Sequence, residues 1–201
     1  MTAVAAPVAT RAQWDEHYLR HRPRLLSEQE CRRFRGRVRP RAGWTAIDLG
    51  CGPGQWTRQL HRWGMDVTGY DYSQRAIGQA TQRGVGTVYG QRIRFDLWDI
   101  VRDPCPDELP PGSIDLITCR ASLAYLEPPA LLEKDRPLLA PGGVFHALIP
   151  VASGPLHAPF HRGMTVQEID RLGCDGWAER STYHLGLGHY GLVLRAPSAP
   201  G

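Results

Sequence analysis

A glycine-rich turn follows the first strongly apolar run of the chain. The segment Asp48-Leu49-Gly50-Cys51-Gly52-Pro53-Gly54 closes the run TAIDL at 45–49. Three closely spaced glycines permit a tight turn and a close approach of the backbone to a ligand. The order GxGxG, with an acid two residues ahead, differs from the dinucleotide fingerprint GxGxxG and from the phosphate loop, which ends in Lys-Ser/Thr. The only lysine is Lys134. Phosphate binding at this turn is therefore disfavoured.

Two further acids stand at the ends of later apolar runs. Asp71 ends MDVTGYD, where its carboxylate is able to accept hydrogen bonds from both hydroxyls of a ribose. Asp99 lies between Trp98 and Ile100, a setting suited to the amino group and flat face of an adenine. Ligands bind outside the carboxyl ends of parallel strands, so Asp48, Asp71 and Asp99 are predicted to meet at one nucleoside-binding edge.

An α/β fold is predicted to position these residues, because short apolar runs alternate with helical stretches. The connection GLG between the last two runs is too short for a parallel crossover, so these two form an antiparallel hairpin. Ser73 and Thr165 are predicted helix caps, Gly64 and Gly84 are stops, and Pro137 is expected to end or kink its helix. The predicted strands are 45–49, 65–71, 93–98, 114–119, 144–149, 177–184 and 190–195, and the predicted helices are 55–63, 74–83, 129–139 and 166–172.

Two helices are predicted ahead of the sheet. One covers WDEHYLRH from Trp14, and the other begins at Ser27, where Glu30 completes a capping-box pattern. We therefore expect residues 1–42 to form a helical cap and residues 43–196 to form one α/β domain.

From about Thr45 to Arg195 the sequence resembles the class I S-adenosylmethionine-dependent methyltransferases. The matching pieces are IDLGCGPGQWT, GYDYS, the Asp99 position, SIDLITCRASLAYL and the turn LLAPGG. The resemblance implies a doubly wound, seven-stranded, mostly parallel sheet of order 3-2-1-4-5-7-6 whose last strand is antiparallel. It also implies S-adenosylmethionine as cofactor and S-adenosylhomocysteine as product. One departure is Ala124, which stands where many small-molecule members carry His.

The resemblance also assigns cofactor contacts. Gly50, Gly52 and Gly54 would line the methionine part, Asp71 the ribose, and Asp99 the adenine amine. Tyr72 and Ile100 would face the adenine, and Cys119 or Arg120 would offer backbone groups to the methionine amine. The full set expected at the cofactor is Asp48, Gly50, Cys51, Gly52, Gly54, Trp56, Asp71, Tyr72, Trp98, Asp99, Ile100, Cys119 and Arg120.

The acceptor is expected to lie between the cap and the segment 151–163. Candidate bases or orienting groups there are His17, Tyr18, His157 and His161, because imidazole accepts a proton near neutral pH. Candidate walls of the acceptor site are Trp14, Tyr18, Tyr125 and Phe160. His157 and His161 have the spacing of a metal pair but no third ligand, and the five cysteines form no CxxC, so no metal site is predicted.

The leading hypothesis is methyl transfer to O, N or C of a small organic acceptor. Cys119-Arg120-Ala121-Ser122 lacks the Asn/Asp-Pro-Pro-aromatic loop of the amino-methyltransferases, which disfavours nucleobases as acceptors. One alternative is an RNA- or protein-directed enzyme that uses the nine arginines between Arg20 and Arg41 to hold phosphates or acidic side chains. Another is a non-catalytic S-adenosylmethionine-binding protein.

Composition limits the protein class further. The 201 residues carry a net charge of +4 and no run of about 18 apolar residues, and the N-terminus lacks the pattern of a signal peptide. We therefore expect a cytoplasmic protein without membrane contact, either a monomer or a homodimer. Its expected partner is a small molecule rather than a nucleic acid.

Overall fold

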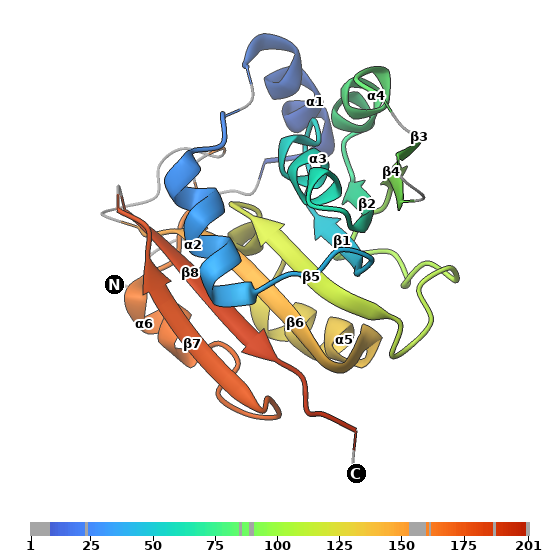
Figure 1. The fold of residues 1–201 in the computed structure, drawn as a ribbon. Helices are drawn as coiled ribbons and strands as arrows, with labels where there is room; N and C mark the ends of the chain where they lie inside the picture. Colours follow the sequence, from blue (N-terminus) through green and yellow to red (C-terminus); the bar gives the residue numbers. More distant parts are fainter. Residues whose placement is uncertain are drawn as a thin grey trace, which may run out of the picture.

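A computed structural model describes residues 9–22, 24–84, 86–88, 91–152, 160, 162–186 and 188–199. The centre is one twisted sheet of order β3-β4-β2-β1-β5-β6-β8-β7 (Figure 1). The strands are β1 (Thr45–Leu49), β2 (Asp66–Asp71), β3 (Gly86–Val88), β4 (Gln91–Leu97), β5 (Ile114–Arg120), β6 (Leu139–Pro150), β7 (Glu179–His184) and β8 (His189–Arg195).

The seven predicted strands occur in the predicted order. β1 pairs in parallel with β2 and β5, β2 with β4, and β5 with β6. β8 runs antiparallel to both β6 and β7, which confirms the hairpin expected from the short GLG connection. The sequence did not predict the three-residue β3, which pairs antiparallel with β4 at the edge of the sheet.

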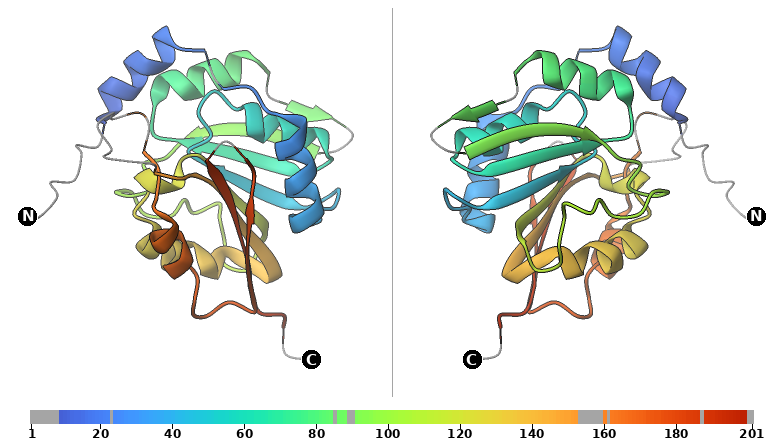
Figure 2. Two further views of the ribbon diagram at one scale, coloured as in Figure 1. Left: turned by 90° about the vertical axis from the view of Figure 1, so that its left-hand side faces the viewer. Right: turned by 90° about the vertical axis from the view of Figure 1, so that its right-hand side faces the viewer.

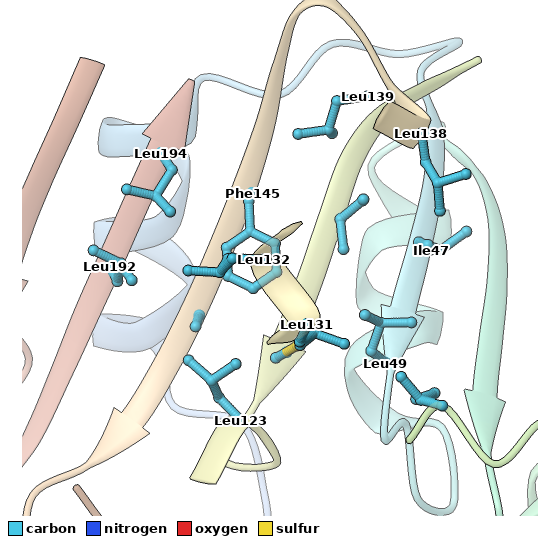
Figure 3. Close-up of a cluster of buried hydrophobic side chains, with 14 of the residues drawn as sticks. Ile47, Leu49, Leu123, Leu131, Leu132, Leu138, Leu139, Phe145, Leu192 and Leu194 are labelled. Atoms are coloured by element: carbon cyan, nitrogen blue, oxygen red, sulfur yellow. The ribbon is translucent and has the colours of Figure 1, made fainter. Parts of the chain in front are cut away.

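Helices cover both faces of the sheet (Figure 2). On one face, Phe34 and Val38 of α2 pack with Leu60 of α3 against the sheet, and Ala80 of α4 packs against β4. On the other face, α5 and α6 cover a second cluster, ten of whose residues are labelled in Figure 3. The helices are α1 (Arg11–Arg20), α2 (Glu28–Val38), α3 (Gln55–Arg62), α4 (Gln74–Gln82), α5 (Pro128–Asp135) and α6 (Val166–Arg171).

Local signals place most helix ends close to the predicted positions, but α1 begins at Arg11, behind a Thr10 capping box, rather than at Trp14. The Ser73 hydroxyl accepts a hydrogen bond from the Ala76 N–H, and Thr165 forms a capping box with Glu168. Pro137 ends the regular helix, since α5 gives way at Arg136 to a 3-10 turn, η2 (Arg136–Leu138). β6 begins earlier than predicted, at Leu139, because the Pro-Gly-Gly segment is accommodated as a register shift against β5.

The first helix lies apart from the second. α1 sits beside the start of α4 (Figure 1), where the Asp15 carboxylate accepts hydrogen bonds from the Ser73 hydroxyl at 2.5 Å and the Arg75 N–H at 3.1 Å. The Gln79 side chain donates to the carbonyl of Tyr18 at 2.7 Å. α1 is thereby held at the end of the sheet where β2 finishes. No helix in the described ranges is long and apolar enough to cross a membrane.

Asp135, in the last turn of α5, is a buried acid that no function explains. Its side chain is buried, and neither carboxylate oxygen has a hydrogen-bond partner among the described residues. Burial raises the pKa of Asp135 to about 7, although the Lys134 ammonium opposes the shift. The folded protein therefore binds this proton more tightly than the unfolded chain, so stability falls as pH rises through the interval between the two pKa values.

We expect Asp135→Asn to stabilise the protein at about pH 8.5 by roughly 2–4 kcal/mol, because the asparagine has the same size but cannot ionise. The gain should shrink at about pH 5, where the wild-type carboxyl is already protonated. Urea unfolding of both proteins at the two pH values measures the difference. An equal difference at both pH values would contradict the assignment of a buried, ionising Asp135.

Candidate functional site

One large cavity opens at the carboxyl ends of β1, β2, β4 and β5. Its volume is about 950 Å³, close to the upper end of the roughly 300–1,000 Å³ common for small-molecule pockets. Its walls come from the glycine turn, the residues after β2, β4 and β5, and α1. The predicted site residues among its lining are Trp14, His17, Tyr18, Gly50, Cys51, Gly52, Asp71, Tyr72, Trp98, Asp99, Ile100, Arg120, Tyr125 and Phe160.

The glycine turn needs its glycines for two reasons. Gly50 has φ +67°, and a Cβ there would lie 2.5 Å from the Cβ of Ser122. The Ser122 hydroxyl is itself held in place by donating to the Leu49 carbonyl at 2.7 Å. Gly52 has φ +53°, and a Cβ there would come within 3.1 Å of the Tyr18 hydroxyl. The turn thus keeps bare backbone at the cavity wall.

Asp71 ties this turn to the end of β2. One carboxylate oxygen accepts from the Gly52 N–H at 2.8 Å, and the other accepts from the Ser73 N–H at 2.9 Å. Burial raises the pKa of Asp71 to about 6, and these two hydrogen bonds limit the rise. The group is therefore mostly ionised at neutral pH. An ionised carboxylate has about four acceptor positions, so two remain for ligand hydroxyls.

The same cavity is also lined by Asp99, Tyr72, Trp98 and Ile100. Here the structure adds Arg11 of α1, whose guanidinium lies 3.6 Å from the Asp99 carboxylate and 5.6 Å from the centre of the Tyr72 ring. Arg102 approaches the same Asp99 oxygen at 3.6 Å. No local pattern in the sequence predicts this contact, because 88 residues separate Arg11 from Asp99.

Four predicted cofactor residues do not line the cavity: Asp48, Gly54, Trp56 and Cys119. The Trp56 indole donates to the Thr118 hydroxyl at 3.2 Å within the core beside Phe34. Gly54 begins α3 and packs against Phe95. Cys119 is fully buried in the core on the opposite face of the sheet. These four residues therefore lie behind the residues that line the cavity.

Asp48 lies buried beneath the glycine turn. One oxygen accepts from the Thr57 hydroxyl at 2.7 Å, and the other has no hydrogen-bond partner in the described part of the chain. Burial raises the pKa of Asp48 to about 7, and the Thr57 hydrogen bond limits the rise. A hydrogen-bond donor that reaches this second oxygen would lower the free-energy cost of burying the ionised carboxylate.

Arg120 makes a buried ion pair that the sequence did not predict. Its guanidinium holds Glu30 of α2 with two contacts, Nε to Oε1 at 2.5 Å and Nη2 to Oε2 at 3.1 Å. The sequence pattern predicts that Glu30 completes a capping box with Ser27. Only half of that box forms, the Ser27 hydroxyl accepting from the Glu30 N–H, because the carboxylate pairs with Arg120 instead. The side chains are 14% and 7% exposed.

The structure brings together the residues that were named as candidate walls of the acceptor site. Trp14 lies at the centre of a ring cluster, which we define as Trp14, Tyr18, Tyr125 and Phe160, with ring centres 5.1–5.5 Å from that of Trp14. His17 stacks on Phe160 at 4.6 Å. Burial raises the pKa of Tyr18 well above its ordinary value, and nearby Asp71 adds to the shift. Tyr18 therefore suits the role of hydrogen-bond donor better than that of base.

Two of the candidate bases, His157 and His161, lie outside the described residues. Among the residues that are described, no group of three His, Cys, Asp or Glu side chains is placed to hold a metal ion. Two non-glycine residues of the lining, Ala121 and Glu127, have positive φ of 59° and 50°. Such backbone strain often accompanies functional sites.

The arginine-rich stretch divides between two surfaces. Arg22 and Arg24 line the large cavity. Arg32, Arg35 and Arg39 instead line a separate, shallow groove beside α2, where the Arg35 guanidinium lies 5.8 Å from the centre of the Trp63 ring.

We expect Glu30→Gln to lower the free energy of unfolding by about 3 kcal/mol, because it leaves the Arg120 guanidinium buried without a counter-charge. Glu179→Gln is the matched control, since it breaks an exposed pair with Arg195 and should cost under about 1 kcal/mol. Denaturant unfolding measures both. Equal losses in the two variants would show that the Glu30 pair contributes no more than a surface contact.

The comparisons with known proteins agree with this geometry. Residues 46–143 match the model of a family described as "Methyltransferase domain". The trans-aconitate 2-methyltransferase of Delftia acidovorans is 39% identical over 108 residues, which are 52% of this chain and 37% of that protein. The ubiquinone biosynthesis O-methyltransferase of Paraburkholderia xenovorans is 30% identical over 102 residues, 50% of this chain and 42% of that protein.

The chain thus spans less than half the length of these curated relatives. Among solved structures, an S-adenosylmethionine-dependent methyltransferase from Mesorhizobium loti has the same fold, with a TM-score of 0.63 and 20% identity. That match covers 84% of this chain and 98% of the other. By its sheet order the chain has the fold of that S-adenosylmethionine-dependent methyltransferase, and residues 46–143 match the methyltransferase-domain family.

Proposed function

We propose that this chain transfers a methyl group from S-adenosylmethionine to a small organic acceptor. The observation that carries the proposal is the single cavity that joins the glycine turn and Asp71 to the ring cluster. A cavity of about 950 Å³ has room for a second ligand beside a nucleoside. The names of the two curated relatives, which specify a ubiquinone-pathway and a trans-aconitate methyltransferase, also support small-molecule acceptors.

The residues present fit this cofactor. Gly50 and Gly52 have positive φ and no room for a Cβ beside Ser122 and Tyr18, so the turn presents bare backbone that can contact the methionine part. Asp71 keeps two acceptor positions for the ribose hydroxyls, and Asp99 with Tyr72 and Ile100 would hold the adenine. When bound, the cofactor supplies a methyl group on a positively charged sulfur, which is already activated for transfer. The protein therefore has mainly to align the acceptor with the methyl group and to exclude water from the site.

The cap would provide that alignment. In our proposal residues 1–42 form a cap over the domain 43–196, and α1 is the part that meets the acceptor. The ring cluster excludes water and offers apolar walls, with the Tyr18 hydroxyl as a donor. His17 lines the same cavity and would accept a proton from a protonated acceptor group.

The proposal is tested by incubating the purified chain with S-adenosylmethionine and a set of small hydroxy, amino and carboxylic acceptors, and measuring S-adenosylhomocysteine. We expect acceptor-dependent formation of S-adenosylhomocysteine. Binding of S-adenosylmethionine without turnover on any acceptor class would favour a non-catalytic binding protein instead.

We expect Asp71→Asn to weaken S-adenosylmethionine binding by about 1–3 kcal/mol, because charge-assisted hydrogen bonds to the ribose are lost. Calorimetry measures the affinity, with Asp107→Asn in an exposed loop as the control. Because the Asp71 pKa is about 6, wild-type binding should also weaken as pH falls from about 7.5 to 5.5. An unchanged affinity in a folded Asp71→Asn protein would place the ribose elsewhere.

We expect Trp14→Ala to lower turnover at least about tenfold while changing S-adenosylmethionine affinity little, because misplacing the acceptor costs rate rather than cofactor contacts. Trp177→Ala is the control, since Trp177 packs against the core on the face covered by α5 and α6. Initial rates and calorimetry on the same samples separate the two effects. Full turnover in Trp14→Ala would mean that α1 takes no part in holding the acceptor.

A further inference from the structure

Arginine dominates the charges that face the large cavity. Three carboxylates, those of Asp71, Asp99 and Glu127, line it. The arginines of the lining are Arg11, Arg22, Arg24, Arg102, Arg120 and Arg162. The functional meaning of this excess depends on which of the guanidinium groups are neutralised within the protein.

Three of the six lie against carboxylates, but only two carboxylates serve them. Arg120 is held by both oxygens of Glu30, and Arg11 and Arg102 share Asp99. These contacts give a carboxylate partner to Arg120 and to the two arginines beside Asp99.

The other three, Arg22, Arg24 and Arg162, have no carboxylate within 4.0 Å among the described residues. The remaining segments of the chain contain no Asp or Glu, so all 20 acids are already counted. Arg24 contacts the His189 ring, with Nη1 2.6 Å from Nε2. A histidine is no counter-charge, so the positive charge of all three arginines is uncompensated.

Arg162 and Arg22 are placed near the ring cluster, and Arg24 lines the same cavity. The backbone N–H of Arg162 donates to the Tyr125 hydroxyl at 2.8 Å, which fixes this residue beside the ring cluster. Arg22 follows His21, whose ring stacks on that of His17 at 4.4 Å. The lining carboxylates on this side are Asp71, which is near Tyr18, and Glu127, which is exposed. The acceptor end therefore combines apolar rings with a net positive rim.

We propose that the methyl acceptor carries an oxyanion group, a carboxylate or a phosphate monoester, that Arg162 binds with help from Arg22 and Arg24. The inference rests on the proposed function and specifies its substrate class. Guanidinium groups bind such oxyanions through paired hydrogen bonds, more strongly beside low-dielectric walls than in bulk water. The ring cluster holds the apolar body of the acceptor, and the arginines fix its charged end, so the nucleophile faces the methyl group.

The test uses protein saturated with S-adenosylhomocysteine and three probes that share one ring: benzoate, phenyl phosphate and benzamide. A second pair, succinate and succinamide, covers aliphatic acceptors. Calorimetry gives each affinity at about 50 and 300 mM salt. We expect at least one acid to bind about tenfold or more tightly than its amide, with the preference shrinking at the higher salt. Whether the carboxylate or the phosphate binds better identifies the oxyanion.

Variants then assign the preference to residues. Arg162→Gln should reduce the acid preference about tenfold, whereas Arg162→Lys should retain part of it because the charge remains. Arg62→Gln, on the exposed end of α3 away from the cavity, is the matched control and should keep the full preference. Thermal unfolding of each variant verifies the fold.

The outcomes separate the two proposals. If S-adenosylhomocysteine binds but amides bind as tightly as acids, or no acid binds, the oxyanion inference is overturned and the proposed function stands. An acid preference that survives intact in Arg162→Gln and in the triple variant with Arg22→Gln and Arg24→Gln also overturns it. If S-adenosylhomocysteine itself does not bind, the proposed function fails and this inference fails with it.

Discussion

The site depends on one carboxylate. Asp71 accepts hydrogen bonds from the Gly52 N–H of one loop and the Ser73 N–H of the next, so it fixes the loops after β1 and β2 relative to each other. Ser73 in turn caps α4 and donates to Asp15, which holds α1 over the cavity. Because the same buried group would receive the ribose, the arrangement of the loops and the binding of the cofactor depend on one carboxylate.

The sequence predicted those features of the fold and of the site that are marked by a pattern in neighbouring residues. The strand ends at β1, β2 and β4 are each marked by an apolar run followed by a glycine or an acid, and the parallel order brings those ends together. Asp71 and Asp99 therefore meet one cavity although 28 residues separate them. Pro137 ended its helix through its missing N–H, and the short GLG connection forced the antiparallel hairpin. Trp14, Tyr18, Tyr125 and Phe160 also lie together, because helix spacing and loop position restrict where such rings can reach.

What the sequence did not predict depends on long-range contacts. Glu30 carried a capping-box pattern, yet its carboxylate stabilises Arg120, which lies 90 residues later, and no local rule ranks those two partners. Arg11 reaches Asp99 because tertiary contacts, among them those of Asp15 and Gln79, dock α1 on α4. Trp56 has the position of a cofactor contact but points to Thr118 in the core. β3 is too short for its pattern to stand out from a loop.

The account is tested most directly by a crystal structure of the protein with S-adenosylhomocysteine. We expect the ribose hydroxyls on the Asp71 carboxylate with its Gly52 and Ser73 hydrogen bonds intact, and the adenine between Tyr72 and Ile100. Because Arg11 now lies between Tyr72 and Asp99, its guanidinium should release Asp99 to the adenine amine. S-adenosylhomocysteine bound elsewhere, such as in the groove beside α2, or bound with Asp71 making no contact to it, would contradict the account.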